Sequence, residues 1–128
     1  MTRPRVSLTR ELFCILGTSR ACSSLQASWN SFFATEGWDA SMDRYTTTEE
    51  ELPNRLSEMF HFDRRLALVI GENLQCALPP LLDGLDASVQ EGRVDTILNR
   101  GGVLTGFFLG AGKLPPREVL RQVGIETP

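Results

Sequence analysis

The sequence has few of the side chains from which metal sites and disulfide frameworks are built. It contains one histidine and three cysteines in 128 residues, and Cys14, Cys22 and Cys76 are widely spaced, with no C-x-x-C pair. A structural zinc site needs four Cys or His ligands at short spacings, so we expect no metal. An odd number of distant cysteines fits the reduced thiols of a cytosolic protein.

Long apolar segments and an excess of basic residues are also missing. No stretch approaches the roughly 20 apolar residues that a membrane-spanning helix needs, and the apolar run at 12–16 is too short for the core of a signal peptide. The net charge is -3 and the pI is about 5.1, whereas non-specific nucleic-acid binding requires a basic surface. We therefore expect a cytoplasmic protein with neither a membrane nor a nucleic acid as partner.

What remains is the composition of one folded domain. The hydrophobic fraction is 41% and the charged fraction is 23%, as in globular proteins. A chain of this length buries more than half of the surface that it exposes when unfolded. No internal repeat, low-complexity tract or linker divides the sequence, so we expect a single core.

Strand-like and helix-like patterns alternate along the chain. The continuous apolar run at 66–70 is typical of a strand that helices cover on both faces, and Thr48 and Glu51 have the spacing of a capping box. The order predicts an α/β fold, a three-layer domain whose mixed, mostly parallel sheet is flanked by helices and ends in a C-terminal β-hairpin. The expected strands are 12–18, 40–47 and 66–70, and the expected hairpin is 94–108 with its turn at Gly101 and Gly102. The expected helices run from Ser23 or Ser24 to Gly37, from Pro53, from 72 to the Pro79-Pro80 pair, and from the Pro115-Pro116 pair to near Gly124.

Three separated blocks of the sequence carry a resemblance to a known family. They read "GTSRACSSLQASWNSFF" at 17–33, "ALVIGENLQCALPPLLDGLD" at 67–86 and "RVDTILNRGGVLTGFFLG" at 93–110. In order and spacing they resemble the N-terminal, substrate-binding domain of shikimate dehydrogenases. The resemblance implies that residues 1–128 form one such domain, without a nucleotide-binding domain.

The resemblance also implies where a substrate would bind. Ser23 falls on one member of the serine pair that receives the substrate carboxylate, while Leu25 replaces the other. Asp95 falls on a substrate-binding asparagine, and the threonine that follows it is retained as Thr96. Together with Gln75, which falls on the catalytic lysine, the implied substrate-binding residues are Ser23, Gln75, Asp95 and Thr96.

The groups that transfer protons in the family are replaced. Gln75 stands on the lysine and Gly110 on the aspartate, and a neutral amide has no proton to exchange near pH 7. The fragment "LGAGK" at 109–113 has only a G-x-G, which is a weak signal for a phosphate site, so we expect neither catalytic residues nor a bound cofactor. A nucleophilic pair of Cys22 and His61 is a remaining alternative.

Three hypotheses for the function follow. The first is a shikimate dehydrogenase-like substrate-binding domain without autonomous catalysis, which acts as a binding or regulatory module for a small hydroxylated ligand. The second is the substrate half of a split, NADP-dependent shikimate or quinate dehydrogenase that works with a separate nucleotide-binding chain. The third is a structural role in self-association, with a homo-oligomer as the product.

Overall fold

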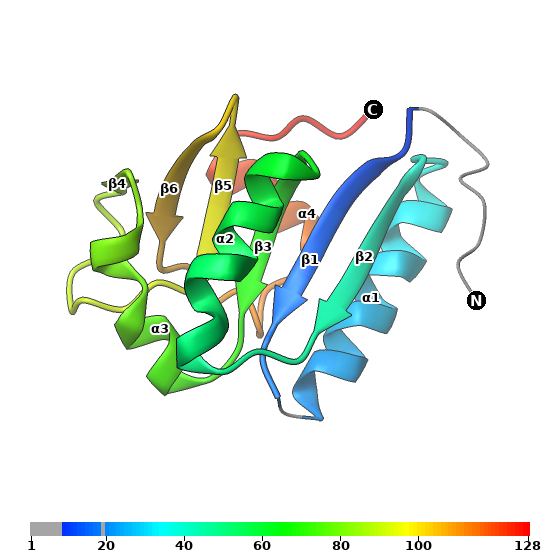
Figure 1. Cartoon of the computed structure of the whole chain (residues 1–128). Helices are drawn as coiled ribbons and strands as arrows, with labels where there is room; N and C mark the ends of the chain where they lie inside the picture. Colours follow the sequence, from blue (N-terminus) through cyan, green and yellow to red (C-terminus); the bar gives the residue numbers. More distant parts are fainter. Residues whose placement is uncertain (1–8, 19) are drawn as a thin grey trace.

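The protein, described from a computed structural model, is built on one six-stranded sheet (Figure 1). The structure describes residues 9–18 and 20–128. The strands are β1 (Glu11–Leu16), β2 (Ala40–Tyr45), β3 (Arg64–Val69), β4 (Gly84–Leu85), β5 (Thr96–Arg100) and β6 (Val103–Phe107). The helices are α1 (Ala21–Thr35), α2 (Leu52–His61), α3 (Glu72–Ala77) and α4 (Pro116–Val123), with short 3-10 turns at Glu49–Glu51 and Pro79–Leu81.

The sheet is mixed and mostly parallel, as the sequence predicts. The strand order is β2-β1-β3-β5-β6-β4, and β5 runs against the other strands, because it pairs antiparallel with both β3 and β6 while the remaining pairs are parallel. The carboxyl ends of β1, β2, β3 and β6 therefore meet at the same edge of the sheet, where the start of β5 also lies. This carboxyl edge is where ligands bind in open α/β sheets.

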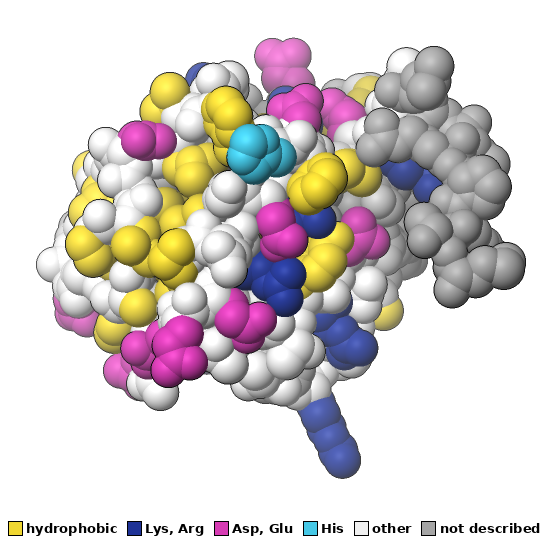
Figure 2. Space-filling view, viewed as in Figure 1, with side chains coloured by type: hydrophobic (Ala, Val, Ile, Leu, Met, Phe, Trp, Pro, Cys, Tyr) yellow, Lys and Arg dark blue, Asp and Glu magenta, His cyan; other side chains and the backbone are white. Residues whose placement is uncertain are grey.

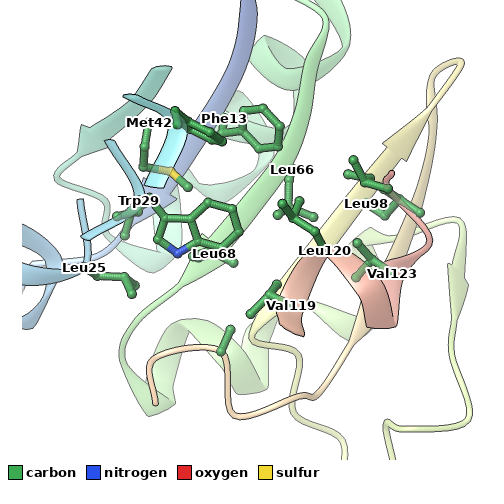
Figure 3. Close-up of a cluster of buried hydrophobic side chains, with 14 of the residues drawn as sticks. Phe13, Leu25, Trp29, Met42, Leu66, Leu68, Leu98, Val119, Leu120 and Val123 are labelled. Atoms are coloured by element: carbon green, nitrogen blue, oxygen red, sulfur yellow. The ribbon is translucent and has the colours of Figure 1, made fainter. Parts of the chain in front are cut away.

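Two hydrophobic clusters cover the two faces of the sheet. On one face, α1 and α4 pack over β1, β3 and β5, and the side chains converge around Trp29, Phe13 and Leu120 (Figure 3). On the other face, α2 and α3 contribute Leu56, Met59 and other apolar residues. Alternate residues of β3 point to opposite clusters, so its continuous apolar run follows from burial on both faces.

Helix α1 begins earlier than its sequence pattern predicts. The expected cap was Ser23 or Ser24, but the helix starts at Ala21 with Arg20 as the N-cap residue, which makes no capping hydrogen bond through its side chain. The hydroxyls are therefore in the first turn and not before it. The end of the helix is as expected, because Gly37 adopts a left-handed φ of 64° that suits glycine.

The predicted capping box and hairpin are both confirmed. Glu51 accepts hydrogen bonds from the backbone N–H and the hydroxyl of Thr48, each at 3.0 Å. β5 and β6 form the antiparallel hairpin, with Gly101 and Gly102 at its turn. Gly102 has a φ of 93°, and a Cβ there would lie 2.6 Å from the ring of Phe60. The positive φ favours glycine at this turn, and a larger residue would have to displace the exposed Phe60 ring at the end of α2.

The surface is mixed in character. Hydrophobic side chains gather on the side that carries α3 and β4, where Leu81 and Leu85 are exposed (Figure 2). Acidic and basic side chains alternate over the rest of this face, as Figure 2 shows. None of the helices in the described residues has the length and apolar character that crossing a bilayer requires.

The placement of the three cysteines gives a direct test of this fold. Cys76 is exposed, whereas Cys14 and Cys22 are buried, and burial raises the pKa of the Cys14 thiol to about 12. Because the thiolate is the reactive species, iodoacetamide at pH 8 should add one group, at Cys76, to the native protein and three groups to the urea-unfolded protein. Mass spectrometry of the intact chain and of its peptides measures this. Rapid labelling of native Cys14 would contradict its place beneath α2.

Candidate functional site

Three of the four predicted substrate-binding residues lie together at the carboxyl edge of the sheet. Gln75 is in α3, directly after β3, and Asp95 and Thr96 are at the start of β5. The backbone joins them, because the Val94 N–H donates to the carbonyl of Gln75 at 3.0 Å and the Val69 N–H donates to the carbonyl of Asp95 at 2.8 Å. Gln75, Asp95 and Thr96 therefore lie in one place in the fold.

Ser23 lies apart from that group. It is exposed in the first turn of α1, and its hydroxyl accepts a hydrogen bond from Arg44 of the outermost strand, β2. Strand β1 separates β2 from β3, and α3 lies on the opposite face of the sheet from α1. Leu25, on the position of the second serine, packs in the hydrophobic cluster between α1 and the sheet.

The carboxylate of Asp95 organises the end of β6. It is buried, with 4% of the residue exposed. Its Oδ2 accepts hydrogen bonds from the backbone N–H groups of Gly110 at 2.8 Å and Ala111 at 2.9 Å, and its Oδ1 accepts from the Leu109 N–H at 2.9 Å and the Thr96 hydroxyl at 3.1 Å. Successive backbone N–H groups around one anion form a nest. The first three N–H groups of the "LGAGK" fragment, at 109–111, are therefore directed at this side chain.

Both ends of the Gln75 amide are also hydrogen-bonded within the protein. Its Nε2 donates to the carbonyl of Val69 at 2.8 Å, and its Oε1 accepts from the guanidinium of Arg93 at 2.6 Å. Gln75 is buried, with 9% of the residue exposed. Gln75 thus ties the end of β3 to the loop that leads into β5, at the position where the resemblance places a lysine.

Arg93 is the residue of this region that sequence reasoning missed. Its guanidinium lies 5.1 Å from the centre of the Phe108 ring, in addition to its bond with Gln75. Arg93 and Gln75 are 18 positions apart in the sequence, and no local pattern in "EGRVDT" indicates that they bond. A positive charge therefore lies beside Gln75 although no lysine is present.

Two hollows open near this edge. One, of about 410 Å³, lies beyond the ends of β1, β2 and β3 and includes Thr18, Thr47, Gly71 and Asn73 in its lining. The other, of about 220 Å³, is lined by Ser88, Gln90, Glu91, Arg93 and Phe108. The second hollow is lined by Arg93, which bonds Gln75, and the first is lined by Glu72, Asn73 and Leu74 of the helix that carries Gln75.

The remaining candidates from the sequence do not assemble. Cys22 is buried in the cluster beneath α1, whereas His61 is exposed at the end of α2 on the opposite face of the sheet. Among the residues that the structure describes, no group of three or more His, Cys, Asp or Glu side chains could hold a metal ion. Neither feature supplies reaction chemistry.

Comparison with known proteins identifies the fold. No family model and no curated protein matches the sequence, but solved structures do. The shikimate 5-dehydrogenase of Listeria monocytogenes, in complex with shikimate and NAD, is 24% identical with a TM-score of 0.75, and the match covers 98% of this chain and 43% of that one. The Thermus thermophilus enzyme, in complex with shikimate, is 29% identical with a TM-score of 0.69, over 91% of this chain and 44% of that one.

A further similar structure is the 5-ketofructose reductase of a Gluconobacter species, with 18% identity and a TM-score of 0.72 over 79% of this chain and 36% of that one. The chain thus has a shikimate dehydrogenase-like fold and spans less than half of the length of these proteins. The resemblance in the sequence blocks is confirmed at the level of the fold.

The Asp95 nest predicts a large and specific effect of a small substitution. In Asp95→Asn, an NH₂ group replaces one oxygen and faces backbone N–H donors, so at least one pair of hydrogen bonds is lost in a buried place. Because each hydrogen bond to a charged group contributes about 1.5 to 3 kcal/mol, we expect the free energy of unfolding to fall by about 3 to 6 kcal/mol. Urea denaturation followed by tryptophan fluorescence measures this change.

Asp83→Asn is the matched control. Asp83 accepts one backbone hydrogen bond, from the Leu104 N–H at 2.8 Å through Oδ2, and the asparagine oxygen can keep that bond. Its effect should be about 1 kcal/mol or less. Equal effects of the two substitutions would show that the nest around Asp95 has no special role.

Proposed function

We propose that this chain is a shikimate dehydrogenase-like substrate-binding domain without autonomous catalysis, which acts as a binding or regulatory module for a small molecule. The observation that carries the proposal is the state of the two positions aligned with the proton-transfer pair. Gln75 has both ends of its amide hydrogen-bonded, and Gly110 has no side chain. Neither position offers a group that could give or take a proton at a substrate oxygen.

The carboxyl edge nevertheless keeps features of a binding site. Hollows of about 410 and 220 Å³ open there, and hydroxyl, amide and guanidinium groups line them. Ligand sites commonly combine such a concave surface with a few polar groups at this edge of an α/β sheet. These features support binding more directly than they support a reaction.

Ligand contacts by Ser23, Gln75, Asp95 and Thr96 remain a prediction of the resemblance. A ligand at Gln75 or Asp95 has to compete with hydrogen bonds that already exist within the protein, and a buried group left unpaired by that exchange costs about 1 to 3 kcal/mol. Ser23 is accessible but already bonded to Arg44. We therefore propose that these residues shape the edge as much as they contact a ligand.

One observation favours a second candidate, the substrate half of a split dehydrogenase. The Listeria and Thermus enzymes match over 43% and 44% of their chains, which fits a domain whose partner is a separate nucleotide-binding chain. In that arrangement the partner would have to supply the proton-transfer group as well as NADP. Mixing this chain with the separately expressed nucleotide-binding half of the Listeria enzyme tests it, since dehydrogenation of shikimate would favour the split enzyme.

The proposed function predicts that the chain alone neither turns over shikimate or quinate nor binds NADP(H). NADPH formation, followed at 340 nm, should stay at the level of a protein-free control, because the aligned positions hold no proton-transfer group. Titration with NADPH, followed by its fluorescence, should show no saturation in the micromolar range. Saturable binding or turnover by the wild type would overturn the proposal.

A further inference from the structure

Arg93 differs from the other arginines of the described chain. It is partly buried, and no described carboxylate lies within 4.0 Å of its guanidinium. The other arginines shielded from solvent, Arg55, Arg64 and Arg65, each have a glutamate within that distance. Because burying a charge without a partner costs free energy, a half-buried guanidinium without an ion pair indicates a place where an anion is missing.

Hydrogen bonding leaves much of this guanidinium unused. One terminal nitrogen donates to the neutral Oε1 of Gln75, and the buried Nε has no acceptor among the described residues. A guanidinium has five N–H groups in a fixed plane that suits the two oxygens of a carboxylate. Gln75 and the ring of Phe108, 5.1 Å away, hold that plane in place, so little rotamer entropy is left to lose on binding.

The pocket beside Arg93 limits what the anion can be. Its volume of about 220 Å³ is below the roughly 300–1,000 Å³ of pockets that take drug-sized ligands. Glu91 also lines it, and its negative charge opposes a dianion such as a phosphate monoester more than a monoanion. Ser88 accepts a hydrogen bond from the Phe108 N–H at 3.0 Å, and its own hydroxyl bonds the Asp86 carboxylate, so the cationic donor for an anion in this pocket is Arg93.

We propose that the pocket of Ser88, Gln90, Glu91, Arg93 and Phe108 binds a small, singly charged carboxylate, with Arg93 as its cationic anchor. The ligand carboxylate meets the edge of the guanidinium, and the body of the ligand lies against Phe108. This inference rests on the proposed binding function and names the ligand class. It puts the anchor at a residue outside the set Ser23, Gln75, Asp95 and Thr96.

Benzoate and benzamide are the probes that test the charge directly, because they share shape and differ in the anionic group. In ¹H–¹⁵N spectra of the full chain, benzoate should shift the signals of Ser88, Arg93 and Phe108 with saturation, and benzamide should bind about 10-fold or more weakly. Equal binding of the two, or benzoate shifts located elsewhere, would overturn the proposal.

Variants separate the anchor from general effects. Arg93→Gln should weaken benzoate about 10-fold or more and leave benzamide unchanged, while Glu91→Gln should strengthen benzoate about two- to fivefold by removing a repulsive charge. Arg100→Gln is the matched control. Arg100 is exposed at the far end of β5, and its loss should change nothing.

Thermal unfolding of each variant shows whether it is folded, since Arg93 also bonds Gln75. If Arg93→Gln is unfolded, Arg93→Lys and Glu91→Gln decide, because a carboxylate site requires weaker benzoate binding in the first and stronger binding in the second. Unchanged benzoate affinity in both would refute the site. Turnover or NADP(H) binding bears on the proposed function alone, whereas the discrimination between benzoate and benzamide bears on the Arg93 pocket alone.

Discussion

The hydrogen bonds that the Asp95 side chain accepts are the interactions on which the carboxyl edge of the sheet depends. Parallel strands end there, and their connecting segments have backbone N–H groups that need acceptors. One buried side chain supplies acceptors for three successive residues after β6, 109 to 111. The backbone carbonyl of the same residue accepts from Val69 at the end of β3. Asp95 therefore holds together the end of β3, the start of β5 and the segment that follows β6.

The position of Arg93 follows from that arrangement. Asp95 and Val94 are held by backbone bonds to Phe107 and Gln75, so the residue before them is directed along α3 towards the Gln75 amide. An arginine from the loop before β5 thus places a positive charge beside the position where the resemblance implies a lysine.

Local patterns in the sequence were enough to predict the fold, but they did not predict the hydrogen bonds of the candidate site. The apolar run of β3, the Thr48–Glu51 box and the glycine pair of the hairpin each depend on residues a few positions apart, and each is observed. The start of α1 was misplaced because the helix begins without a side-chain cap. The bonds of the Asp95 carboxylate to residues 109 to 111 and of the Gln75 amide oxygen to Arg93 span 14 to 18 residues. The alignment of positions shows neither these pairings nor the separate place of Ser23.

The replacements at positions 95 and 110 are physically linked. An asparagine at 95, as the resemblance implies for the family, has one acceptor and one donor, so it cannot receive three backbone N–H groups and a hydroxyl as a carboxylate does. The Gly110 N–H, in turn, donates to that carboxylate at 2.8 Å from a backbone with a φ of 73°, which other residues adopt at a cost. Asp95 and Gly110 are thus linked through the nest, because the aspartate supplies the acceptor and the glycine permits the backbone conformation from which the N–H reaches it.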